Sequence, residues 1–338
     1  IVNDAIGGGG PLNVMDATRG NLLTVHCQEL MQNAATGSDW FQAPAILSKQ
    51  GNTPWHDRKN PGDRSYDDDL GKTVLDRMLA VLLGRTYFVV DGDICEATDL
   101  NWMTRTALGF TRGLLEVAHD LGAERVFELC DRYAAKNPGF EIPKSIADRN
   151  LVEFRANVKV ERNGDIGTLR VFRPEVKNAL SAQTVAELDS GLAELVADDS
   201  IKGIVFTSYD GSLAGADIGE LAALPNAEEC RAICNRTHPI MARFSECPKP
   251  IVAAVNGPVL GGGAEFSMAC QARVLGPMTM VGQPEVNLGI IPGYGGTMRL
   301  PRLVGVERAA ELIRTARTIS AKVAADWGWG TLVETNDV

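Results

Sequence analysis

The feature that most constrains the fold is a short apolar segment followed by three consecutive glycines and the beginning of a helix. Residues 251–255 (IVAAV) are rich in β-branched side chains and lie between a proline and an Asn-Gly pair, which predicts a buried strand. Gly261, Gly262 and Gly263 follow, and AEFSMAC from residue 264 is typical of a helix start. Because glycine lets backbone approach a ligand and a helix start points free N–H groups outward, this turn is suited to hold an oxygen that becomes negative during a reaction.

Two carboxylic acids accompany this turn. Glu265 lies in the first turn of the predicted helix, and Glu285 follows in a Gly-Gln-Pro-Glu segment. Taken alone, Glu285 is equally consistent with an ordinary acid at a helix start, where the helix dipole favours it. Together with Glu265 and an anion-binding backbone, it suggests acid–base chemistry beside a carbonyl group, with the two acids titrating as a coupled pair.

Four segments, in order along the chain, resemble the enoyl-CoA hydratase (crotonase) family. They are RPEVKNAL (173–180), SLAGADIGEL (212–221), VNGPVLGGGAEF (255–266) and GQPEVNLGIIPGYGGTMRLPRLVG (282–305). Four ordered motifs are a far more specific signal than a single glycine loop. The resemblance implies an α/β crotonase-like domain, with repeated ββα units wound into a superhelical core, over residues 151–338. Related enzymes continue into further helices, so we expect the C-terminal helices of this domain to be missing after Val338.

The resemblance also assigns roles to matching residues. It implies that the backbone N–H groups of Ala216 and Gly262 form an oxyanion hole. It implies further that Glu265 orients or deprotonates a water molecule and that Glu285 delivers or removes the Cα proton. Isomerases, hydrolases and decarboxylases of the family commonly replace one of the two glutamates, whereas hydratases carry both, so the pair favours a hydratase.

Other positions of the motifs are implied to form the substrate site. Gly293 would leave room for the water, in a pocket that also contains Gly261. The residues implied to hold the CoA moiety are Val176, Lys177, Ala214, Asp217 and Ile218. A structural role for Asp217 is equally compatible with the motif. A solvated side chain without a ligand contact is equally compatible for Lys177.

The first part of the chain, residues 1–146, carries little strand pattern. Apolar side chains recur there at three- and four-residue intervals over residues 20–34, 70–90 and 99–135, which predicts a mostly α-helical domain. A proline- and glycine-bearing stretch then separates it from the second domain.

Two glycine-bearing segments of this region resemble the duplicated C-terminal helical domains of 3-hydroxyacyl-CoA dehydrogenases. They are GGGGPLNVMDATRGN (7–21) and LGFTRGLLEVAHDLGA (108–123), the second with Arg112-Gly113 where Gly-Pro is usual. No apolar strand precedes the four glycines at the start of the first segment, so they do not fit a dinucleotide-binding turn. We therefore expect no nicotinamide cofactor and no dehydrogenase activity.

Composition excludes several classes of partner. A net charge of −10 argues against a nucleic-acid or anionic membrane surface, and no apolar run reaches the length of a membrane span. Seven cysteines, an odd number without paired CxxC spacing, indicate thiols in a reducing cytoplasm. Cys230, Cys234 and His238 share one face of a predicted helix, but no fourth ligand is evident, so we predict a core- or partner-facing stripe and no metal site.

The sequence thus predicts hydration of α,β-unsaturated enoyl-CoA thioesters to 3-hydroxyacyl-CoA in fatty-acid β-oxidation-type metabolism. The substrate carries the coenzyme A, and no separate cofactor is expected. We expect the protein to form a homo-oligomer. Because residue 1 is isoleucine, we expect a piece of a longer bifunctional dehydrogenase–hydratase protein. Two alternatives stay open: a Δ3,Δ2-enoyl-CoA isomerase with one glutamate as proton shuttle, and a non-catalytic assembly module that binds CoA thioesters.

Overall fold

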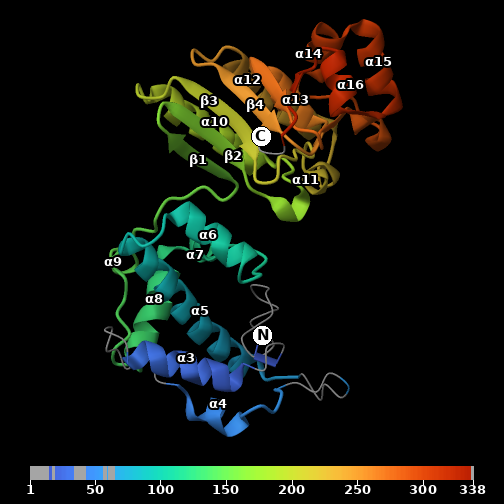
Figure 1. The fold of residues 1–338 in the computed structure, drawn as a ribbon. Coiled ribbons are helices and arrows are strands. Elements are labelled where there is room, and N and C mark those ends of the chain that lie inside the picture. Colours follow the sequence, from blue (N-terminus) through green and yellow to red (C-terminus); the bar gives the residue numbers. More distant parts are fainter. Residues whose placement is uncertain (1–14, 17–19, 34–42, 56–58, 60–64, 336–338) are drawn as a thin grey trace. The chain divides into compact units, whose positions relative to one another are not determined.

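The computed structural model describes residues 15–16, 20–33, 43–55, 59 and 65–335. It divides into two compact units, Ile1–Ala156 and Asn157–Val338, each with a hydrophobic core of its own (Figure 1). Over the described ranges, no helix combines the length and the apolar character that crossing a bilayer requires.

The described part of the first unit is built around helices. They are α3 (Asn21–Asn33), α4 (Ala45–Gln50), α5 (Asp68–Asp91), α6 (Ala97–Thr106), α7 (Leu114–Leu121), α8 (Ala123–Ala134) and α9 (Lys144–Ala147). Fully buried side chains from α5, α7, α8 and α9 meet in the core, among them Leu83, Tyr87, Leu115 and Ile146. The mostly helical character predicted from apolar spacing is therefore confirmed.

The helical pattern predicted over residues 99–135 is interrupted twice. It contains α6, α7 and α8, because residues 107–113 form a turn and Gly122 has a left-handed φ of 79° between α7 and α8. The other glycine-bearing segment, residues 7–21, lies almost entirely outside the described residues.

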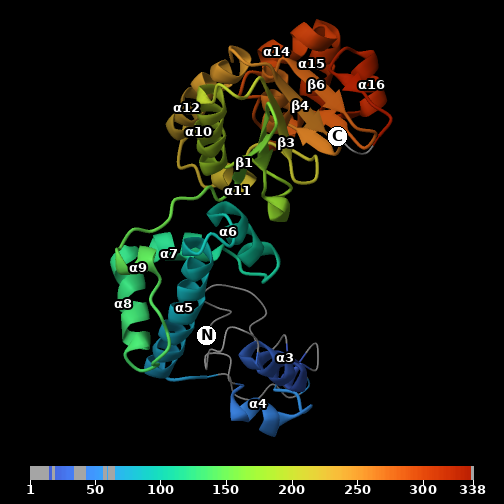
Figure 2. The same ribbon diagram turned by 60° about the vertical axis from the view of Figure 1, so that its left-hand side comes forward.

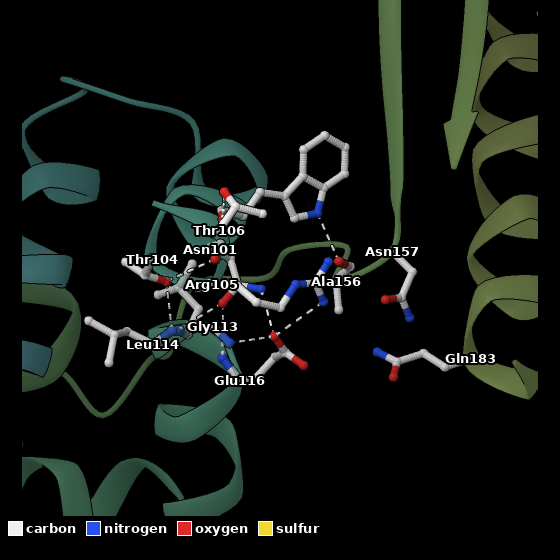
Figure 3. A network of polar contacts seen from close by, with 12 residues as sticks. Asn101, Thr104, Arg105, Thr106, Gly113, Leu114, Glu116, Ala156, Asn157 and Gln183 are labelled. Carbon is white, nitrogen blue, oxygen red and sulfur yellow. Dashed lines mark hydrogen bonds and ion pairs between the residues drawn. The ribbon is translucent and has the colours of Figure 1, made fainter. Parts of the chain in front are cut away.

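A polar network ties α6 to α7 (Figure 3). The fully buried Asn101 donates to Glu116 Oε2 (2.9 Å) and accepts the Leu115 N–H (3.1 Å), and the Gly113 N–H also donates to Glu116 Oε2 (2.8 Å). A Cβ atom on Gly113 would lie 1.9 Å from Asn101 Oδ1. Only glycine fits there, which gives a physical reason for the glycine in the Arg-Gly pair of this segment.

The second unit contains two sheets. The larger one has six strands in the order β1 (Val158–Asn163), β2 (Ile166–Val171), β3 (Gly203–Ser208), β4 (Ile251–Val255), β6 (Ala272–Leu275) and β9 (Thr331–Leu332). The first two strands form an antiparallel hairpin and the remaining pairs are parallel. The smaller sheet consists of β5 (Pro258–Leu260), β7 (Met280–Gly282) and β8 (Thr318–Ser320). The predicted strand at 251–255 is confirmed as β4, with alternate side chains fully buried.

Helices complete the unit (Figure 2). They are α10 (Ala182–Ala197), α11 (Ile218–Ala222), α12 (Ala227–Ser245), α13 (Gly262–Ala269), α14 (Gly296–Val304), α15 (Val306–Thr315) and α16 (Ala321–Asp326), with 3-10 turns η2 (Pro174–Val176) and η3 (Pro284–Leu288). In the core, the Phe244 ring of α12 packs edge to face against Phe206 of β3 and Phe266 of α13, and the latter two rings are tilted relative to each other. Two strands followed by a helix recur as β1–β2–α10 and as β4–β5–α13, in agreement with the expected ββα repeat.

Candidate active site

Glu265 is held inside the second unit at the fourth position of α13. Its side chain is 2% exposed, and Oε1 accepts the backbone N–H groups of Tyr294 (2.8 Å) and Gly296 (2.6 Å). Burial raises the pKa of Glu265 to about 7, against the opposing effect of these two amides, while the nearby Glu285 raises it further. The site therefore contains a desolvated carboxyl group that titrates near neutrality.

Glu285 lies in η3, and its side chain is 8% exposed. Burial raises the pKa of Glu285 to about 7. With its amide turned so that the nitrogen faces the carboxyl group, the buried Gln283 donates to Glu285 Oε1 (2.8 Å) and Oε2 (3.2 Å). A Cβ on Gly261 would lie 3.1 Å from Glu285 Oε1, so this carboxyl group adjoins the glycine turn before α13. The two glutamates are thus held by different donors, one set from the backbone and one from a side chain.

The glycine turn lies directly against the Gly215-Ala216 segment. A Cβ on Gly215 (φ 98°) would be 2.8 Å from Leu260 O and 3.3 Å from Gly262 N, and a Cβ on Gly262 would be 3.3 Å from Ala216 N. Side chains at positions 215 and 262 would separate these backbones, so the close approach depends on glycine.

The amides of Ala216 and Gly262 are available in this arrangement. Leu180 pairs with Ala216 in a parallel β-bridge, in which the Leu180 N–H donates to Gly215 O (2.7 Å) and the Asp217 N–H donates to Leu180 O (3.1 Å). This bridge therefore does not use the N–H of Ala216. Gly262 opens α13, where the first N–H groups have no helical partner. Across the part of the chain that the structure describes, neither of these two N–H groups donates a hydrogen bond. Two neighbouring unused donors can hold an anionic oxygen.

Gly293 lies where the Pro-Gly-Tyr-Gly-Gly segment passes α12. A Cβ there would be 3.1 Å from Cys234 Sγ, and the Gly293 carbonyl accepts the His238 Nε2–H (2.7 Å). The following ring, Tyr294, lies 3.1 Å from the position of a Cβ on Gly262. Gly293 is therefore packed against α12, and its neighbour Tyr294 contacts the glycine turn.

The residues implied to hold CoA lie on two adjoining segments. The Ala214 N–H donates to Lys177 O (3.2 Å), Val176 ends η2 and is 39% exposed, and Ile218 begins α11 and is 60% exposed. An exposed edge of this kind leaves backbone accessible to a ligand.

Asp217 has structural partners in this region. Its carboxylate caps α11 by accepting the N–H groups of Gly219 and Glu220, and it forms an ion pair with Arg173 (2.9 Å). Burial opposes ionisation, but the Arg173 guanidinium and the backbone amides outweigh it, so the pKa of Asp217 is lowered. Its side chain is therefore engaged with the fold, in agreement with a structural role for Asp217.

The motif-based prediction did not include Gln283, Arg173 or the Tyr294 and Gly296 amides. All four residues lie within the motifs that carry the resemblance, but no spacing indicates which atoms they contact. Within the described residues, no group of histidine, cysteine or acidic side chains could hold a metal ion. For the stripe on α12, the structure instead shows His238 bonded to a backbone carbonyl.

Comparison with known proteins identifies the family of the second unit. The fold of the second unit is of the crotonase type, with two buried glutamates beside a glycine turn. Residues 161–336 match the sequence profile described as Enoyl-CoA hydratase/isomerase, and the chain belongs to this family.

Individual relatives cover about half of the chain. The chain is 44% identical over 172 residues to Fatty acid oxidation complex subunit alpha of Shewanella halifaxensis, a match that covers 49% of the chain and 24% of that protein. It is 41% identical over 164 residues to Probable enoyl-CoA hydratase of Bacillus subtilis, covering 48% of the chain and 63% of that protein. The crystal structure of enoyl-CoA hydratase from Thermoplasma volcanium aligns with a TM-score of 0.51 at 31% identity, over 53% of the chain and 72% of that structure. The chain thus spans only part of the length of these relatives.

Proposed function

We propose that the second unit adds water to α,β-unsaturated enoyl-CoA thioesters and forms 3-hydroxyacyl-CoA. The observation that carries the proposal is the pair of buried glutamates beside two unused backbone N–H groups. The names of the curated relatives, an enoyl-CoA hydratase and a fatty acid oxidation complex subunit, support the same substrate class.

The two backbone amides would stabilise the charge that develops during the addition. As the water oxygen bonds to Cβ, the electrons of the double bond move towards the thioester oxygen. The N–H groups of Ala216 and Gly262, which lie on touching segments, would donate to that oxygen. Removing one such donor typically costs about 3 kcal/mol of transition-state stabilisation.

The glutamates divide the proton transfers between them. Glu265 accepts two backbone N–H groups on one oxygen, which favours its carboxylate form, so it would take the proton of the attacking water through its other oxygen. Glu285, also buried and titrating near neutrality, would give its proton to Cα. One water is consumed, and the pair begins and ends the cycle holding one proton, which moves from Glu285 to Glu265 and then re-equilibrates.

The remaining predicted positions would bind substrate. Gly261 and Gly293, beside Glu285 and Cys234 respectively, would form the reacting pocket. The backbone of Val176, Ala214 and Ile218 would hold the adenine end of CoA, with Lys177 available for a phosphate. No redox cofactor is needed for this chemistry, because water addition transfers no electrons between molecules.

For the first unit we infer a relationship to the C-terminal helical domains of 3-hydroxyacyl-CoA dehydrogenases. A fatty acid oxidation complex subunit among the relatives of the chain supports this inference. The absence of dehydrogenase activity, the homo-oligomeric state and the cytoplasmic location stay predictions.

The test is hydration of crotonyl-CoA, followed by the loss of absorbance of the conjugated thioester. We expect turnover by the whole chain, and a fall of about 10²- to 10⁴-fold in kcat for Glu265→Gln and for Glu285→Gln. Glu307→Gln, the same change at an exposed acid in the first turn of α15, is the matched control and should turn over normally.

Three other results would count against the proposal. Deuterium exchange at Cα without water addition would favour the isomerase. Saturable thioester binding with no turnover would favour the non-catalytic module. If the chain shows neither turnover nor thioester binding, the CoA-thioester assignment is wrong for this chain.

A further inference from the structure

One face of α12 packs against the backbone segment that holds Glu265. Thr237 is 3% exposed and lies beside the Tyr294 side chain. His238 donates from Nε2 to the Gly293 carbonyl (2.7 Å), and Cys234 Sγ lies 3.1 Å from the position that a Cβ on Gly293 would take. The helix therefore contacts two successive residues of the 293–296 segment through three of its side chains.

The same segment supplies both hydrogen bonds to Glu265. Tyr294 N–H and Gly296 N–H donate to Glu265 Oε1 at 2.8 and 2.6 Å. On its other side, Arg299 of α14 donates from Nη1 to Tyr294 O (3.1 Å). Glycine-rich backbone is intrinsically free to move, so its position depends on such external contacts. The Gly293 carbonyl and the Tyr294 N–H belong to the same peptide plane, so a bond to that carbonyl constrains the direction of the Tyr294 donor itself.

We propose that His238 is a positioning residue, which fixes the 293–296 segment through its bond to the Gly293 carbonyl and so keeps the two amides on Glu265. This assigns a specific role to His238, one of the three residues of the stripe that was predicted to face the core or a partner. The inference rests on the proposed function for its effect on rate, because His238 acts only through Glu265.

The expected consequence concerns the charge on Glu265. Amide donors favour a carboxylate over a carboxylic acid, so loosening them raises the pKa of Glu265. The other groups that face Glu265 are Glu285 from η3, Cys234 from α12, and Tyr294 and Arg299 from the segment and α14. None of these is altered by a substitution at position 238, although a charged imidazole would itself act on Glu265.

A pair of variants separates the hydrogen bond from the charge. His238→Gln keeps an N–H donor and His238→Phe keeps a planar ring without a donor, and both remove the imidazole. Asn235→Ala, at an exposed position of the same helix, is the matched control. The titration of Glu265 is followed by NMR of the ¹³C-labelled glutamate carboxyl carbons, assigned by the signal lost in Glu265→Gln, which needs no turnover.

We expect Glu265 to titrate about half to one pH unit higher in His238→Phe than in His238→Gln, with Asn235→Ala like the wild type. In the hydration assay, kcat should fall about tenfold in His238→Phe and recover in His238→Gln, with little change in KM. Equal titration in the two His238 variants, both folded by circular dichroism, would overturn the inference. If the wild type does not hydrate crotonyl-CoA, the proposed function fails, while the NMR comparison still decides the role of His238.

Discussion

The carboxamide of Gln283 offers the sharpest test of how the two glutamates share a proton. Gln283 is 1% exposed, and its nitrogen lies 2.8 and 3.2 Å from the two oxygens of Glu285. Gln283→Leu keeps a side chain of similar size and removes the donor. A hydrogen bond to a charged group contributes about 1.5–3 kcal/mol, and one pKa unit corresponds to about 1.4 kcal/mol. Since only one of the two bonds is short, we expect the pKa of Glu285 to rise by about one unit in the variant.

The direction of the effect on rate depends on which protonation state of the Glu265–Glu285 pair is active. Hydration requires one proton on the pair, so kcat/KM should rise and then fall as the pH increases. Without Gln283 the carboxylate of Glu285 is less stable, and the last proton leaves the pair at higher pH. The alkaline limb of the profile should therefore move up by about one unit in Gln283→Leu, with a smaller change in the acid limb.

The assay is crotonyl-CoA hydration between about pH 5 and pH 10, with Gln271→Leu as the control. Gln271 makes three hydrogen bonds to the backbone at Phe244, Ser245 and Ile251, so its loss should lower stability without moving either limb. An alkaline limb that stays in place in Gln283→Leu, or moves down, would refute the reasoning.

Three further predictions concern packing and stability. Gly293→Ala places a Cβ 3.1 Å from Cys234 Sγ, so kcat should fall about tenfold. Adding Cys234→Ala to the same chain should restore most of the lost kcat. If kcat is not restored, the steric explanation is wrong. Arg173→Met removes the ion pair that keeps the pKa of Asp217 low, so urea titration should show a loss of about 1–2 kcal/mol in the free energy of unfolding at pH 7. That contribution is present above about pH 4 and disappears as the pH falls, so an equal loss at pH 3 would point to another cause. Burial raises the pKa of Glu265 to about 7, above its ordinary value of 4.5. The raised pKa lowers the free energy of unfolding by up to about 3 kcal/mol above pH 7 and has no effect below pH 4. Glu265→Gln should therefore be more stable than the wild type at pH 8 and equal to it at pH 4, and a gain at both pH values would contradict this cause.

Local patterns predicted much of the second unit. The strand at 251–255, the glycine turn and the helix after it were all evident, because apolar alternation and glycine preferences act over a few residues. The resemblance predicted that Glu265, Glu285, Ala216 and Gly262 belong to one site, because several ordered motifs together indicate a shared fold.

The first unit shows where periodicity is insufficient. Apolar spacing over residues 99–135 predicted helix, but the structure contains three helices separated by a turn and by Gly122. The break at Gly113 is decided by Asn101, twelve residues earlier, which occupies the space where a side chain would go. The spacing of apolar residues indicates which face of a helix is apolar. It does not indicate where a side chain such as that of Asn101 lies against the backbone of another segment.

The sequence by itself determined the class of domain, the two acids and the glycines that let backbone segments touch, because these depend on residue type and short-range order. Only the tertiary structure decided which donors hold each acid. The amides on Glu265 come from 29 and 31 residues away, and the imidazole behind them comes from a helix 55 residues before the carbonyl it binds. Burial, which raises the pKa of both glutamates to about 7, is likewise a property of the packed unit, since desolvation requires all the surrounding segments at once.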